Sequence, residues 1–160
     1  MPIRNAREAD FVKCVSIAHD AWPEFKEREA IYHILCKYFN NTCFVSEENG
    51  EIQGFLLGFI SQVDSRDGYI HLIVVDSSLQ RCGIAESLYT EFFKTVRGMG
   101  ATRVRLTVDP ANSTSLGFHA SMGFRPEILG ERIQVGNVWA AKDFNGEGRH
   151  MVPFVRELTE

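Results

Sequence analysis

The stretch that decides the fold is residues 75–92, VDSSLQRCGIAESLYTEF. It reads as the exit of a buried strand, a polar loop, and a helix whose first turn is Cys82–Ala85 and whose apolar residues then recur at every fourth position. Backbone N–H groups at a helix N-terminus are unpaired donors, and a glycine at position 83 lets an anion approach them. We therefore expect a diphosphate-binding turn, unless Gly83 merely begins a helix and Arg81 is a solvated cation of the loop.

The chain lacks the two commonest nucleotide-binding patterns. It has no G-x-x-x-x-G-K-[ST] sequence and no G-x-G-x-x-G after a strand near the N-terminus. Phosphate-loop and dinucleotide-binding folds are therefore excluded, and a plain nucleotide-binding module is disfavoured.

The rest of the chain alternates between helical and extended patterns. Residues 70–75 are almost continuously apolar, which is typical of a central strand covered on both faces. An Asn-Gly pair at 49–50 between apolar runs at 43–45 and 52–60 predicts a β-hairpin. We also expect strands at 3–5, 104–108, 124–129 and 151–158, helices at 9–20, 27–39, 83–96 and 112–122, a turn at 64–68 and a Gly-rich connection at 136–148. The strand at 104–108 should run parallel to the strand at 70–75, because a helix connects them.

Composition favours one compact domain spanning residues 1–160. The chain is 44% hydrophobic and 24% charged, which is enough for a full core. No apolar run approaches a membrane span and no signal-peptide pattern begins the chain, so we expect a cytosolic protein that makes no membrane contact. The net charge of −4 disfavours nucleic acid as a partner and leaves a cationic small substrate open.

The four cysteines show no metal-binding spacing. Cys14, Cys36, Cys43 and Cys82 form neither a CxxC nor a Cys/His pattern. We expect reduced cysteines that pack in the protein, and no metal.

Two motifs in order carry a family resemblance. The segment Gln80–Ala85, QRCGIA, resembles the (Q/R)-x-x-G-x-(G/A) signature of the GNAT acyl-CoA N-acyltransferase superfamily, and it follows an apolar strand as that signature does. Residues 112–119, NSTSLGFH, and the Gly-Phe pair at 123–124 resemble the family's N-x-x-A-x-x-F-Y and G-F motifs. The order of expected elements agrees with the family over almost the whole chain.

The resemblance implies a fold and a function. The fold is α/β, with a mixed, mostly antiparallel twisted sheet of about seven strands, a V-shaped split between the central parallel strands, and four flanking helices. The function is transfer of an acetyl group from acetyl-CoA to a primary amine of a small molecule or peptide, by direct attack in a ternary complex. A homodimer stays open, and the alternative function is a CoA-binding sensor or regulatory module without turnover.

The resemblance also implies where acetyl-CoA binds. The diphosphate would lie on the backbone of Gln80, Arg81, Cys82, Gly83, Ile84 and Ala85, with added charge from Arg81. In the family the strand at 70–75 carries a bulge, and the backbone of Ile73, Val74 and Val75 would pair with pantetheine, one amide polarising the thioester carbonyl. Asn112 and Ser115 would contact the cofactor, although Asn112 also fits a plain helix cap.

Three residues are the main candidates for proton transfer. The family tyrosine that protonates the departing thiolate aligns with His119, whose imidazolium could donate that proton; a surface or cap histidine is the alternative. For the base, Tyr69 aligns with a position where some relatives carry glutamate, and His71 shares its strand face by the two-residue period. His71 also fits a satisfied core histidine, and Asp76 fits either a base or a turn former.

The acceptor site of the family lies between the loop that joins the first two helices and the last strands. In this chain that loop contains Asp20, Trp22, Glu24 and Phe25, and the later region contains Trp139. Carboxylates beside aromatic rings suit a cation. The alternative is that Trp22 and Phe25 only pack the helix corner.

Overall fold

The computed structural model describes residues 2–25, 27–80 and 82–159, and the chain divides into two compact units, 1–101 and 102–160. The first unit contains an antiparallel sheet in the order β1-β2-β3-β4. Its strands are β1 Ile3–Asn5, β2 Phe44–Glu48, β3 Glu51–Ile60 and β4 Asp67–Val75. Its helices are α1 Phe11–Ala21, α2 Glu29–Tyr38 and α3 Ile84–Gly98, with short 3-10 helices η1 Glu8–Asp10, η2 Asn40–Thr42 and η3 Ser77–Leu79.

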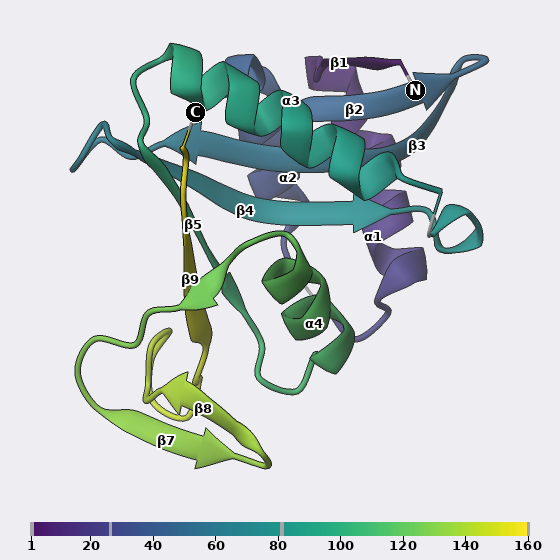
Figure 1. Ribbon diagram of the computed structural model, residues 1–160. Helices are drawn as coiled ribbons and strands as arrows, with labels where there is room; N and C mark the ends of the chain where they lie inside the picture. Colours follow the sequence, from purple (N-terminus) through teal and green to yellow (C-terminus); the bar gives the residue numbers. More distant parts are fainter. Residues whose placement is uncertain (1, 26, 81, 160) are drawn as a thin grey trace. The chain divides into compact units, whose positions relative to one another are not determined.

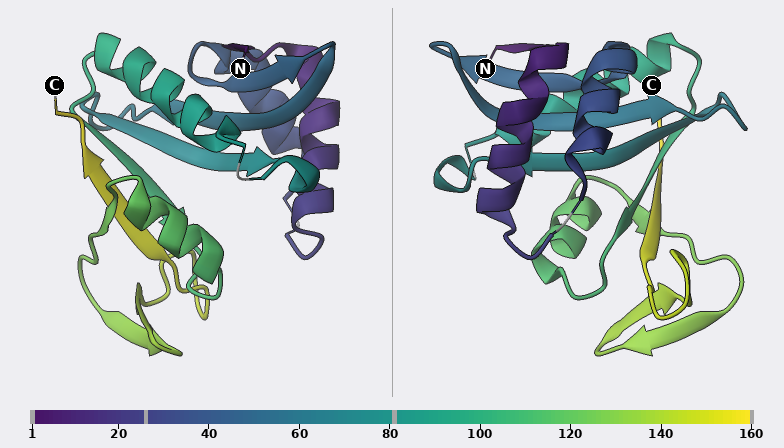
Figure 2. Two further views of the ribbon diagram at one scale, coloured as in Figure 1. Left: turned by 45° about the vertical axis from the view of Figure 1, so that its right-hand side comes forward. Right: turned by 180° about the vertical axis from the view of Figure 1, so that it is seen from behind.

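The helices of the first unit cover both faces of its sheet. Helices α1 and α2 pack together on one face, and α3 crosses the opposite face (Figures 1 and 2). The α1–α2 side has a continuous core, which includes Cys14, Ile17, Tyr32, Leu35, Cys36, Phe55 and Leu57. On the other side, α3 buries residues that recur at helical spacing: Ile84, Leu88, Tyr89, Phe92, Phe93 and Val96. The helical pattern seen in the sequence is confirmed.

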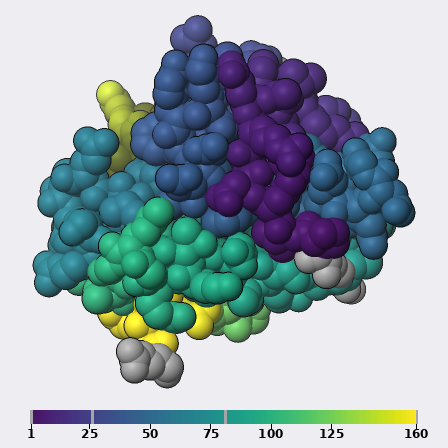
Figure 3. All heavy atoms as spheres, turned by 90° about the horizontal axis from the view of Figure 1, so that it is seen from above, coloured from purple at the N-terminus to yellow at the C-terminus, as the bar shows by residue number. Residues whose placement is uncertain are grey.

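The β2–β3 hairpin forms where the sequence predicts it. Asn49 and Gly50 both have positive φ angles, 54° and 80°, as the tight turn that matches strand twist requires. Strand β1 then pairs with β2, from Ile3 opposite Ser46 to Asn5 opposite Phe44. In the space-filling view, the purple N-terminal residues lie against blue residues of the chain region that includes β2 (Figure 3).

The β3–β4 pair contains a β-bulge. Leu57 lies opposite Leu72, whereas the next residue, Gly58, lies opposite Ile70. His71 is therefore the extra residue of the bulge and has no partner in the β3–β4 register. A side chain at position 58 would come within 2.6 Å of the Phe92 ring and 2.7 Å of the Tyr69 carbonyl oxygen, so the close approach there requires glycine. The bulge expected in this strand is confirmed.

The second unit contains a three-stranded antiparallel sheet in the order β5-β9-β6. Its strands are β5 Arg103–Val108, β6 Arg125–Pro126 and β9 Val152–Glu157, and its helix is α4 Ser113–Ser121. A separate hairpin joins β7 Arg132–Val135 to β8 Val138–Ala141. With four strands in the first unit, these elements confirm the expected class of mixed, mostly antiparallel sheet with four α-helices.

Several predicted boundaries are wrong. Strand β4 begins at Asp67, inside the expected turn at 64–68, because residues 68–69 pair with the end of the long strand β3 and the Asp67 carbonyl accepts the Ser61 N–H at 2.9 Å. Helix α2 begins at Glu29 rather than at position 27, because Arg28 has an extended backbone with φ −68° and ψ 140°. The expected strand at 124–129 shortens to the two residues of β6.

The Gly-rich connection at 136–148 is also partly wrong. Its first residues form the turn of the β7–β8 hairpin, with Gly136 at φ 61°, and strand β8 follows. A Gly-Asn pair between two short extended runs is itself a hairpin signal, which the weak apolar pattern around it obscured. The single domain over residues 1–160, the parallel pairing of 70–75 with 104–108 and the V-shaped split stay predictions.

Candidate active site

The turn between β4 and α3 has the geometry of an anion-binding helix start. Asp76 caps η3, accepting hydrogen bonds from the Ser78 N–H at 2.9 Å and the Ser78 hydroxyl at 2.7 Å. Gly83 follows in the left-handed region, with φ 80° and ψ 7°, and α3 begins at Ile84. The first helical hydrogen bond of α3 joins the Ser87 N–H to the Gly83 carbonyl at 3.1 Å. The N–H groups of residues 84–86 come before this bond and point out of the helix N-terminus.

The left-handed conformation of Gly83 corrects the sequence interpretation in one respect. We expected the first helical turn at Cys82–Ala85, but a residue with positive φ cannot belong to a right-handed helix, so α3 starts two residues later. Among the described residues other than its chain neighbours, the atom nearest to a side chain at position 83 would be Glu86 Oε2, 4.0 Å away. The left-handed backbone angle at position 83 therefore requires glycine, and the missing side chain leaves space through which an anion can approach. The predicted contribution of Arg81 lies outside the described residues.

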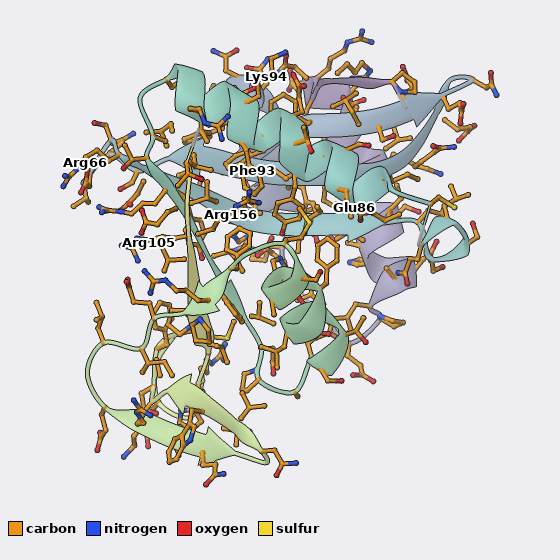
Figure 4. All side chains as sticks on the ribbon, viewed as in Figure 1. Arg66, Glu86, Phe93, Lys94, Arg105 and Arg156 are labelled. Carbon is orange, nitrogen blue, oxygen red and sulfur yellow. The ribbon has the colours of Figure 1, made fainter. Side chains whose placement is uncertain are left out.

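The N-terminus of α3 also carries a carboxylate side chain. Glu86 lies in the first turn of α3 (Figure 4), where it stabilises the positive end of the helix. The same charge opposes a diphosphate.

The proposed pantetheine strand is the C-terminal half of β4. Ile73 and Val74 are half-buried and Val75 is buried, and they pair with Leu56, Phe55 and Gly54 of β3. Asp76, which ends this strand, has its pKa lowered by the Ser78 hydrogen bonds, first that of the hydroxyl and then that of the N–H. A carboxylate held in that way is a weak base, and its contacts are those of the turn former considered above.

His71 lies on β4 beside a carboxylate from a distant segment. Its Nε2 is 2.7 Å from both carboxylate oxygens of Glu27, which precedes α2. The His71 side chain is 29% exposed and that of Glu27 is 16% exposed. Tyr69, two residues earlier, stacks on Phe59 with ring centroids 5.3 Å apart. The structure thus gives His71 a polar partner and packs Tyr69 against an aromatic ring.

The segment between α1 and α2 forms an open pocket of about 460 Å³. Three charged side chains, one histidine and two apolar side chains line it: Glu27, Arg28, Glu29, His19, Pro23 and Phe25. Of the predicted acceptor residues, Phe25 lines the pocket, and Trp22 stacks on Phe25 with ring centroids 5.3 Å apart. Glu24 is exposed in the turn between them.

Sequence reasoning did not identify His19, Glu27 and Arg28, which line this pocket. The signal available was the alternation of acidic and basic residues at 27–29, immediately before an amphipathic helix. That pattern is common on solvated helix ends, so it did not stand out.

The second unit holds the residues of the second motif. Asn112 caps α4, its Oδ1 accepting the Ser115 N–H at 3.1 Å. The Ser115 carbonyl in turn lies 2.8 Å from Nδ1 of His119, whose imidazole is only 4% exposed. The rings of Phe118, Phe124 and Phe154 surround it. These contacts make Asn112 a helix cap and place His119 in an aromatic core.

Burial sets the protonation of His119. It lowers the pKa of the imidazole below its ordinary value near 6.5, and the hydrogen bond to the Ser115 carbonyl opposes this effect only in part. At neutral pH the ring is therefore mainly neutral, with its proton on Nδ1, because a carbonyl can only accept. The proton donor proposed for this position would be the minor, charged form.

Trp139 lies on β8 in the second unit, 48% exposed. The Arg132 guanidinium of β7 sits over its ring, 5.4 Å from the centroid. The Trp139 ring therefore already makes a cation–π contact with an arginine of its own hairpin.

Within residues 2–25, 27–80 and 82–159, no group of three or more His, Cys, Asp or Glu side chains could hold a metal ion. No helix in that part of the chain is long and apolar enough to cross a membrane.

The chain is similar in sequence to known acetyltransferases. A model of the acetyltransferase (GNAT) family matches residues 11–124. The L-2,4-diaminobutyric acid acetyltransferase of Halalkalibacterium halodurans is 33% identical over 84 residues, which are 52% of this chain and 44% of that relative. The enzyme of the same name from Virgibacillus pantothenticus is 26% identical over 117 residues, 73% of this chain and 72% of that relative. This chain thus spans less than half of the first relative's length.

A solved structure shows the same fold. Diaminobutyrate acetyltransferase EctA from Paenibacillus lautus, in complex with L-2,4-diaminobutyric acid and coenzyme A, superposes with a TM-score of 0.74 at 21% identity. The likeness covers 99% of this chain and 96% of that one.

Proposed function

This chain belongs to the acetyltransferase (GNAT) family, and from that premise we propose that it transfers an acetyl group from acetyl-CoA to a primary amine of a small molecule. The observation that carries the proposal is the turn after β4, where left-handed Gly83 opens the N-terminus of α3 inside the family-matched region. Such a helix start binds a diphosphate through its N–H groups and its dipole. In this proposal, the diphosphate of acetyl-CoA occupies that place.

The cosubstrate fits the residues of the first unit. The N–H groups of residues 84–86 offer donors to the diphosphate, and Gly83 itself has no side chain that would block its approach. Pantetheine then runs along the backbone of 73–75, where an N–H group polarises the thioester carbonyl. Ser115 and Asn112 of the second unit are the proposed further contacts to the cofactor.

The reaction needs no covalent enzyme intermediate. The amine nitrogen attacks the carbonyl carbon of the thioester, a C–N bond forms, and the C–S bond breaks with its electron pair on sulfur. The amine must first lose a proton to a base, and the thiolate takes up a proton as it leaves. We assign the base to His71, whose partly exposed imidazole can reach substrate, and retain His119 as the candidate acid. Tyr69 is the second candidate for proton transfer on β4.

A diamino acid is the acceptor class that we propose. The α1–α2 pocket places Glu27 and Glu29 next to Arg28, so it can pair an ammonium group with a carboxylate and a carboxylate group with a guanidinium. The two named relatives are acetyltransferases of L-2,4-diaminobutyric acid, a molecule with both kinds of group. Trp22, Glu24 and Trp139 stay proposed additional contacts, and a peptide amine is the alternative acceptor.

The proposed location is the cytosol. Its support is the free state of Cys14, Cys36, Cys43 and Cys82, which suits a reducing compartment. A homodimer remains a proposal that measurement of the mass in solution would test.

An amine panel tests the proposed function. The protein is mixed with acetyl-CoA and, separately, L-2,4-diaminobutyrate, other diamino acids, polyamines, aminoglycosides and peptides, and release of CoA thiol and product mass are measured. We expect N-acetylated diamino acid. CoA binding with no acetylated product from any amine would instead identify a sensor module and contradict the assignment as an enzyme.

A further inference from the structure

The pair formed by Glu27 and His71 joins two parts of the first unit that are 44 residues apart in sequence. Glu27 lies two residues before α2, which begins at Glu29, and His71 lies on β4 at the bulge. A regular strand would point successive side chains to opposite faces. The bulge lets both His71 and Leu72 face the α1–α2 side, since Leu72 packs in the core there and His71 meets Glu27.

The contact fixes the tautomer of His71. Both oxygens of Glu27 lie 2.7 Å from the same nitrogen, Nε2. An ionised carboxylate only accepts hydrogen bonds, so Nε2 must carry a hydrogen and donate it. Nδ1 is then the nitrogen with a lone pair, and it is the atom of His71 that can take up a proton.

Glu27 also belongs to the wall of the α1–α2 pocket, where the acceptor is proposed to bind. One carboxylate therefore connects that pocket to the imidazole on β4. His71 precedes Ile73, the first residue assigned to pantetheine, by two positions, so the two lie at most about 7 Å apart along the strand. In the proposal, the acceptor amine lies between the base and the thioester carbonyl carbon.

We propose that Glu27 is a positioning residue for acetyl transfer: it holds His71 in the Nε2–H tautomer, with Nδ1 directed to the acceptor amine. The inference rests on the proposed function. The amine gives its proton to Nδ1, and the negative charge of Glu27 balances the imidazolium that forms. The lone pair of the amine nitrogen then attacks the carbonyl carbon of the thioester.

Other titratable groups surround this pair, so a pH profile must be assigned with variants. The pocket brings His19 from α1 and Arg28 and Glu29 from the start of α2, and Tyr69 is the near neighbour on β4. Tyr32 of α2 is buried, and its pKa is raised first by burial and then by the charge of Glu27. Among these groups, His19 is the other imidazole, so His19→Gln is a required control.

The experiment compares Glu27→Gln, Glu27→Asp and Glu29→Gln by steady-state kinetics and pH profile with the diamino acid. Glutamine removes the charge, and its amide can donate to Nε2 and select the wrong tautomer. We expect Glu27→Gln to lower kcat by about 10-fold or more and to move the acidic limb of kcat/KM to lower pH. Glu27→Asp, which keeps the charge, should restore part of kcat.

Glu29→Gln is the matched control, because it removes the same charge from the same pocket. It should raise KM for the amine and leave kcat and the acidic limb in place, and His19→Gln should leave the limb in place too. If Glu27→Gln keeps wild-type kcat and acidic limb while the wild type acetylates amines, the inference is wrong and the proposed function stands. If the wild type acetylates no amine, both are wrong. The thermal unfolding temperature of each variant shows whether a loss of activity comes from loss of the base or from loss of the fold.

Discussion

The two candidate histidines show how differently the same side chain behaves in the two units. His71, in the first unit, is partly exposed and held by the carboxylate of Glu27. His119, in the second, is 4% exposed, bonded to a backbone carbonyl and surrounded by phenylalanine rings. A carboxylate can balance a positive ring, whereas burial among aromatic carbons opposes one. The comparison teaches that the environment of a histidine, rather than its alignment to a motif, decides how well the ring can carry a positive charge.

The largest expected effect is at His71. His71→Ala removes the proposed base, and we expect kcat to fall by ~100-fold or more while binding of acetyl-CoA, measured by calorimetry, stays close to wild type. His33→Ala is the control for loss of a histidine, because His33 Nε2 contacts Glu8, at 2.8 Å, rather than Glu27. A kcat for His71→Ala within about threefold of wild type would remove His71 from the chemistry.

His119 should matter less than His71 at neutral pH. Because only its minor charged form can act as the acid, we expect His119→Ala to lower kcat by about 10-fold. His119→Tyr should recover part of that loss and extend the alkaline limb of the profile, since phenol keeps its proton to about pH 10. If the tyrosine variant has the same alkaline limb as the wild type, the departing thiolate takes its proton from elsewhere.

Gly83 provides a test of cosubstrate binding that is independent of both histidines. Gly83→Val places a branched side chain at a left-handed backbone position and in the space assigned to the diphosphate, so we expect CoA affinity to fall by about 10-fold or more. Gly83→Asn is the control for backbone strain, because asparagine tolerates positive φ better than valine. Comparable CoA affinity in all three proteins would place the diphosphate somewhere else.

The smallest expected effect is a pH dependence of folding that comes from His119. Its folded pKa lies below its unfolded value of about 6.5, so the unfolded chain binds more protons as the pH falls through this range. The contribution to stability is complete above about pH 6.5 and decreases below it, down to the folded pKa. Urea unfolding between about pH 7.5 and 5 should show this decline, and His119→Gln should flatten it. An equal slope in that variant would mean that the ring is not held neutral by burial.

Local sequence patterns predicted the parts of the fold that depend on near neighbours. The Asn49-Gly50 turn, the apolar run at 70–75 and the four-residue period of α3 each form a compact signal, and each is confirmed. Weak local signals failed, as at the β7–β8 hairpin, where one Gly-Asn pair stands among polar residues.

The candidate site was only partly predictable. His71 could be named from its strand, but its partner Glu27 is 44 residues away and meets it through tertiary packing, which no periodicity encodes. Likewise, the motif that places His119 does not show that its ring is buried, because this depends on Phe154 at the other end of the second unit's sequence. Residue type gives the candidate, and packing gives its chemistry.

A crystal structure with coenzyme A and L-2,4-diaminobutyrate bound tests the central claim most directly. We predict the diphosphate on the N–H groups of residues 84–86, and the acceptor amine in the α1–α2 pocket within hydrogen-bond distance, directly or through one water, of His71 Nδ1. A diamino acid bound away from Glu27 and His71, with another base beside its amine, would contradict the account.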